Sequence, residues 1–138
     1  MMRARLSPLL RRFRRAEAGA VAVEFAFVIP VFVVFCLGII EVGRAMWIRN
    51  SIQTATEEAG RFAMAHTTAT DATLVSHAED YFDAVGADEP VFVVAHDTVG
   101  GVNFVTVSGT YTFNSMFSFI DIFDVTLDGQ SRVPLVPS

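Results

Sequence analysis

The sequence has 138 residues, a formal net charge of −5, a single cysteine, and 52% hydrophobic against 18% charged residues. A chain of this length holds at most one ordinary domain, and its hydrophobic content excludes a disordered protein. One cysteine excludes an intrachain disulfide scaffold. Because a soluble domain usually carries about 25% charged residues, part of this chain belongs in lipid.

The charge is divided unevenly along the chain. Six arginines against one glutamate give residues 1–19 a charge of +5, and the remainder carries −10. The acidic remainder excludes nucleic-acid binding by that part. Between these regions, Ala18 to Ile40 is a run of 23 residues interrupted only by the charge of Glu24. A helix of that length spans about 35 Å, enough for a hydrocarbon core of about 30 Å.

The arginines come directly before the apolar run, so the positive-inside rule predicts a cytoplasmic N-terminus and residues 41–138 outside. No convincing signal-peptidase site follows the run, because Arg44 stands where small residues would be needed. The sequence therefore predicts a single-pass protein of the inner (cytoplasmic) membrane, with the lipid bilayer as one partner.

The residues around Gly19 form an ordered pattern: a basic leader, the glycine, four small or apolar residues, Glu24, and then the apolar helix. This order resembles the processing site of type IV prepilins, where a membrane peptidase cuts after the glycine. The resemblance implies a cut between Gly19 and Ala20. The Glu24 carboxylate would then neutralise the new amine of Ala20 on a neighbouring subunit. On position alone, Glu24 could instead snorkel to the interface.

The stretch from Ala22 to Ala63 resembles the N-terminal domain of the TadE-like family, the pilin-like minor subunits of tight adherence (Tad) pilus systems. The matching residues are Glu24-Phe25, Pro30, Gly38, Glu41, Gly43-Arg44, Asn50, Ala55 and Gly60-Arg61-Phe62-Ala63. The resemblance implies cleavage by a prepilin peptidase and assembly of Tad pili with other pilin-like subunits and the assembly platform. No cofactor and no enzymatic activity are expected. The alternatives are an uncleaved membrane-anchored binding or sensor domain and a type II secretion pseudopilin.

A continuous helix is predicted over residues 20–65, with its membrane part at about 20–40. Pro30 lies in mid-span and predicts a kink, because it removes a backbone donor. Two ion pairs, Glu41 with Arg44 and Glu57 with Arg61, are expected to support the helix on a solvated face. Beyond the membrane, a helical spacing predicts one packing seam made of Ala45, Ile48, Ile52, Ala55, Ala59 and Phe62. The seam would pack against either the chain's own sheet or another pilin helix.

Residues 66–138 are predicted to form a small extracytoplasmic domain. A short amphipathic helix is expected over 72–85, ending at Gly86. Strands are expected at 91–96 and 102–113 around a Gly100-Gly101 turn, followed by a strand pair around an Asp128-Gly129 turn. The predicted class is a membrane-anchored α+β fold with a three- or four-stranded antiparallel sheet. The apolar stretch Phe117–Phe123 would be either core or a partner surface.

No motif for catalysis or metal binding occurs in the sequence. The three histidines lack ligand spacing, and no nucleophile elbow or phosphate-binding glycine loop is present. The acidic residues Glu79, Asp80, Asp83, Asp88 and Glu89 lack a calcium-loop register and are expected to form a solvated face. These patterns favour an assembly protein.

Overall fold

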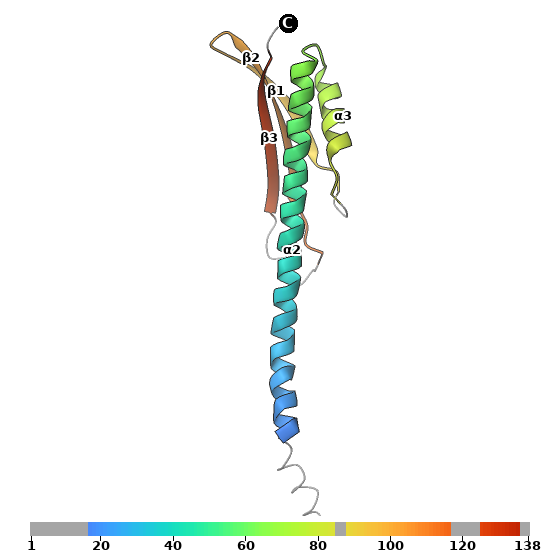
Figure 1. The fold of residues 1–138 in the computed structure, drawn as a ribbon, viewed down its shortest axis with the longest axis vertical. Helices are drawn as coiled ribbons and strands as arrows, with labels where there is room; N and C mark the ends of the chain where they lie inside the picture. The colour runs from blue at the N-terminus through green and yellow to red at the C-terminus, as the bar shows by residue number, and fades with distance from the viewer. Residues whose placement is uncertain (1–16, 85–87, 117–124, 136–138) are drawn as a thin grey trace, which may run out of the picture. The chain divides into compact units, whose positions relative to one another are not determined.

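The computed structural model describes residues 17–84, 88–116 and 125–135. Its elements are the helices α2 (Glu17–Ala65) and α3 (Asp71–Tyr81) and the strands β1 (Val91–Val99), β2 (Val102–Phe113) and β3 (Val125–Leu135), drawn in Figure 1. The chain divides into two units at Ile39 and Ile40, so that α2 contributes to both. A long apolar helix, a short helix and a three-stranded antiparallel sheet confirm the predicted α+β class. The Phe117–Phe123 prediction lies outside the described residues.

The sheet of the second unit has the order β1-β2-β3, with both pairs antiparallel. β1 and β2 form a hairpin in which Val99 pairs with Val102 across Gly100 and Gly101. Both glycines have positive φ, 61° and 81°, as a tight hairpin turn of the primed type requires. The predicted Gly-Gly turn is therefore confirmed.

The predicted turn at Asp128-Gly129 is wrong, because β3 runs through both residues as one strand of 11 residues. Gly129 pairs with Gly109 on β2, and α2 passes close over both. A side chain at Gly129 would begin 3.0 Å from the backbone nitrogen of Gln53. The glycine thus permits close approach of helix and sheet, which is a common role of a glycine inside a strand.

The core lies between the sheet and the part of α2 that belongs to the second unit. On β2, alternate residues face the helix and are buried: Val105, Val107, Gly109, Tyr111 and Phe113. Alternation with a period of two is expected when one face of a sheet is covered and the other is solvated. Val107, Tyr111 and Phe113 pack with Ile48, Ile52, Ala55 and Ala59 of α2 and with Phe92 and Leu127 of the flanking strands. Val105 packs with Ala63 of α2 and Leu74.

α3 covers the core beside β1 and α2 (Figure 1). It begins after Thr70, whose side chain caps the helix by accepting a hydrogen bond from the backbone of Thr73 at 3.3 Å. The predicted end near residue 85 is wrong, since α3 stops at Tyr81 and Phe82 is extended. The Ser51 hydroxyl of α2 exchanges hydrogen bonds of 2.9 and 3.0 Å with the backbone of Asp83, which replaces the helical bonds lost there.

Candidate assembly site

The apolar part of α2 in the first unit is exposed on every side from Gly19 to Phe35, and Cys36 to Gly38 are half-buried. The side chains of Val21, Phe25, Phe27, Ile29, Phe32 and Phe35 are all at least half exposed. A helix that is apolar on every face and exposed over this length is typical of a membrane span. α2 is long and apolar enough for one, and it fits a single-pass anchor at the N-terminal end of the chain.

The residues of the expected cleavage site, Gly19 and Ala20, lie in the first turn of α2 and are exposed. The first backbone N–H groups of a helix have no intrahelical partner, so this turn is the easiest part of α2 to unwind. An extended substrate backbone in a peptidase cleft would require that unwinding.

Glu24 is exposed on the apolar helix one turn after Ala20. Within the described residues it forms neither an ion pair nor a side-chain hydrogen bond. A carboxylate at membrane depth costs about 2.5–3.5 kcal/mol on insertion scales and normally has a partner. Any partner of Glu24 must therefore come from outside the described part of the chain.

Pro30 lies inside α2, and the helix continues through it. A membrane helix tolerates an internal proline when neighbours satisfy the freed carbonyl. The kink at Pro30 stays a prediction.

The structure places the six residues of the seam in the second unit. Ile48, Ile52, Ala55 and Ala59 are at most 1% exposed, and they pack against the chain's own sheet. Ala45 and Phe62 are partly buried at the two ends of the seam. Of the two alternatives from the sequence, these contacts favour the chain's own sheet as the partner of the seam.

The ion pairs on α2 differ from those expected. Arg61 pairs with Glu58 at 3.0 Å and not with Glu57, which instead accepts a hydrogen bond from Gln53. Glu41 and Arg44 do pair, at 3.4 Å, but their side chains are only 8% and 14% exposed. The expected solvated face is therefore wrong for this pair.

Glu41 and Arg44 connect α2 to the end of β2. The Glu41 carboxylate accepts hydrogen bonds from the backbone N–H of Met116 at 2.7 Å and from the Ser115 hydroxyl at 3.3 Å. The Arg44 guanidinium donates to the carbonyl of Asn114 and lies 4.5 Å from the ring centre of Phe113. We call this set of contacts the Glu41 clasp. Sequence reasoning missed it because its partners are 69 to 75 residues away along the chain.

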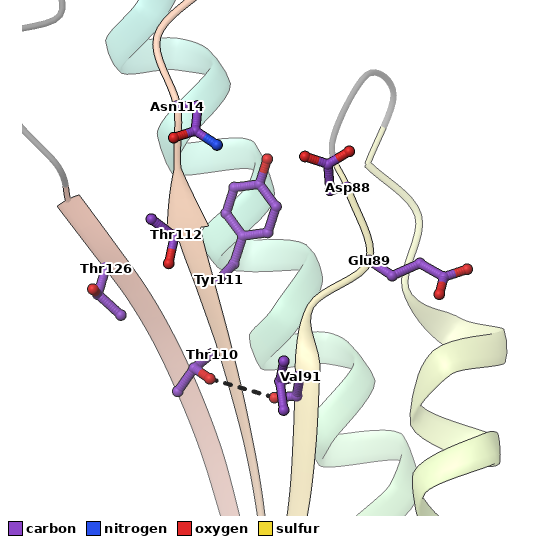
Figure 2. A pocket seen from close by; sticks show the side chains of 8 residues that line it. All are labelled: Asp88, Glu89, Val91, Thr110, Tyr111, Thr112, Asn114 and Thr126. Atoms are coloured by element: carbon purple, nitrogen blue, oxygen red, sulfur yellow. Dashed lines mark hydrogen bonds between the residues drawn. The ribbon is translucent and has the colours of Figure 1, made fainter.

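An open hollow of about 270 Å³ lies at the end of β2 (Figure 2). The exposed side chains of Asp88 and Glu89 flank it, and threonines from β2 and β3 line it. Tyr111 is 6% exposed, and its hydroxyl forms no hydrogen bond within the described residues. The hollow is polar and acidic, and the other predicted acidic residues, Glu79, Asp80 and Asp83, are exposed elsewhere.

The histidines take part in local contacts. Phe62 stacks between the rings of His66 and His77, at centroid distances of 4.2 and 4.4 Å. His96 contacts Asp71 at 2.7 Å. Among the described residues, no group of three metal-ligating side chains lies together.

Residues 19–61 match the family model described as TadE-like protein. This segment is TadE-like. No curated protein and no solved structure matches the chain. The TadE-like segment begins at the glycine of the expected cleavage site and includes the apolar run, the helical half of the Glu41 clasp and most of the buried seam. It indicates a pilin-like protein related to Tad pili, in agreement with the resemblance found in the sequence.

The TadE-like segment ends near a second close contact between α2 and β3. A side chain at Gly60 would begin 2.7 Å from the Ser131 hydroxyl and 3.2 Å from Val133. Gly60 and the Glu41 clasp thus both belong to the contact between α2 and the sheet, which continues to Ala63. Gly60, Glu41 and Arg44 carried the family resemblance, so several of these residues serve the packing of the second unit.

Proposed function

We propose that this chain is a TadE-type minor subunit that acts in the assembly of Tad pili. It is inserted with its N-terminus in the cytoplasm, is cut between Gly19 and Ala20 by a prepilin peptidase, and then packs through its apolar helix against other pilin-like subunits. The work of such a protein is assembly, and no catalytic step is assigned to it.

The observation that carries the proposal is the combination of the TadE-like match with an apolar helix that is exposed from Gly19 to Phe35. The match begins at Gly19, directly before the proposed cut. The arginine-rich leader supports the orientation. A helix exposed on every face can contact lipid before assembly and neighbouring helices after it.

Glu24 supplies the proposed assembly contact. Cleavage creates a cationic amine on Ala20, which needs a counter-charge once helices bundle away from water. The Glu24 carboxylate has no partner in the described part of its own chain and lies on the exposed helix. It is therefore free to pair with the amine of a neighbouring subunit.

Intact mass measurement of membrane-extracted protein tests the cleavage step. In cells with the cognate peptidase, the chain should begin at Ala20, and without the peptidase it should keep its leader. Gly19→Val should stay uncut, because bulk at this position hinders the extended backbone. Gly38→Val is a matched control, since Gly38 has open space around it and lies far from the cut. Full-length chain beside an active peptidase would contradict the proposal.

A further inference from the structure

The second unit carries exposed apolar side chains at the start of its helix. Ile40, Val42, Met46 and Trp47 of α2 are each more than half exposed, and so is Met116 after β2. We call these five residues the apolar collar. Large apolar side chains grouped on one part of a surface usually mark a contact with a partner or with lipid.

No free charge interrupts the collar. From Phe25 to Ile48 the only charged residues are Glu41 and Arg44. They pair with each other and with the backbone after β2, so neither is presented to the surroundings as an unpaired charge. The next charged residue, Arg49, is exposed and has no ion pair within the described residues. The apolar surface of the helix therefore continues past Ile40 and ends at Arg49.

The length of this surface matches a whole bilayer. A helix over Ala18–Ile40 is about 35 Å long, close to the hydrocarbon core, and the seven further residues to Trp47 add about 10 Å. The total of about 45 Å equals the core together with both headgroup regions, which measures about 40–45 Å. Tryptophan is enriched in membrane interfaces because its ring is apolar and its N–H is polar.

The Glu41 clasp determines how deep Met116 lies in the bilayer relative to Trp47. The backbone N–H of Met116 is bound to the Glu41 carboxylate, and Glu41 comes six residues before Trp47 on the helix, nearer to the apolar run. Six residues of helix correspond to about 9 Å. If Trp47 lies among the headgroups, Met116 lies at least as deep.

We propose that the apolar collar is a lipid-binding surface, which seats the second unit on the phospholipid headgroups at two places, the α2 segment from Ile40 to Trp47 and Met116 after β2. The inference rests on the membrane insertion in the proposed function and goes beyond it, because a helix alone would leave the sheet free of the bilayer. The bilayer is chosen over a protein partner because the helical part of the collar, from Ile40 to Trp47, follows the membrane span directly in sequence and carries no unpaired charge.

The test uses the full chain in vesicles of phosphatidylethanolamine and phosphatidylglycerol, at a low ratio of protein to lipid and without other pilin subunits. Trp47 is the chain's only tryptophan, so its fluorescence reports one site. Lipids brominated near the headgroups should quench most of this fluorescence, and lipids brominated near the bilayer centre should quench less. A dye on Met116→Cys, in a Cys36→Ala background, should be quenched in the same way.

Val99→Cys in the same background is the matched control, because Val99 is exposed and apolar but lies at the opposite end of β2 from Met116. Its dye should not be quenched. Met116→Trp in a Trp47→Phe background gives the same reading without a dye, should the labelled protein fold poorly. A Met116 probe as free of quenching as the Val99 probe would overturn the proposal. If protection of the probes from quenching rose with protein density in the vesicles and did not depend on the position of the bromine, the collar would be bound by a second copy of the chain. That result would also overturn the proposal. Cleavage after Gly19 is measured separately, so either result leaves the proposed function to be judged on its own.

Discussion

Gly109 and Gly129 are register partners on β2 and β3, and both lie beneath the same turn of α2. A Cβ atom at Gly109 would stand 2.7 Å from the Ile52 side chain, and one at Gly129 would stand 3.0 Å from the backbone of Gln53. Two side-chain-free positions, one on each strand, thus let the helix approach the sheet. The packing of the second unit depends on this pair.

Gly109→Ala should destabilise the second unit by about 1–3 kcal/mol, because the added methyl group overpacks a filled core. Urea unfolding of the detergent-solubilised protein, followed by circular dichroism, measures the loss. Gly43→Ala is the control, since Gly43 lies on α2 with open space around it. It should stabilise the helix by about 0.5–1 kcal/mol. Equal effects of the two substitutions would contradict the close approach of helix and sheet.

Glu41→Gln should weaken the Glu41 clasp. The amide can still accept a hydrogen bond from Met116, but Arg44 is left mostly buried without its counter-charge, at a cost of about 1–3 kcal/mol. Hydrogen exchange of the backbone from Asn114 to Met116 should become faster. Glu58→Gln, which removes the exposed pair with Arg61, should change stability by at most about 1 kcal/mol and leave that exchange unchanged. Unaltered protection at Met116 would show that the clasp does not hold this segment.

Glu24→Gln should still insert, still be cut after Gly19, and fail in assembly. An amine buried without its counter-charge costs about 3–5 kcal/mol, enough to weaken subunit association by two orders of magnitude or more. Piliation and crosslinking between subunits are compared with wild type at matched protein levels. Normal piliation in the variant would mean that Glu24 is merely tolerated at the end of the membrane span and has no role in assembly.

Gln53→Ala should expose the free edge of β3. The Gln53 amide accepts from the backbone N–H of Gln130 at 3.3 Å and donates to its carbonyl at 3.2 Å, which blocks strand addition there. Its loss should cost about 1 kcal/mol and make the protein associate as its concentration rises. Sedimentation velocity measures the association, with Thr54→Ala as a control because Thr54 is an exposed neighbour on α2. A variant that stays monomeric at all concentrations would show that the edge needs no such cover.

Local signals predicted the local features well. Period-two alternation identified β2, and Gly100-Gly101 identified its hairpin, because a turn of two residues with positive φ is decided by those two residues. Asp128-Gly129 has the same local signature but lies within a strand. Its glycine permits the close approach of α2 and does not form a turn. The sequence could not show that difference, which depends on a residue of another element.

Only part of the candidate site could be predicted from the sequence. The apolar run and the pattern around Gly19 and Glu24 are contiguous in sequence, so they could be recognised without knowledge of the fold. The environment of Glu41 could not, because its partners follow β2 and only the folded sheet brings them to α2. The same pattern of residues predicted an i,i+3 pair correctly and its burial incorrectly.

The contribution of α2 to the core has a consequence for biosynthesis. Ile48, Ile52, Ala55 and Ala59 come from the helix, and the sheet that they cover is made later in the chain. A polypeptide beginning at residue 66 would therefore lack one wall of its hydrophobic interior and should be degraded by proteases. During synthesis the helix leaves the ribosome first, and helices form far faster than sheets. The emerging strands thus meet a helix that is already formed, and pairing of the last strand becomes the step that completes folding.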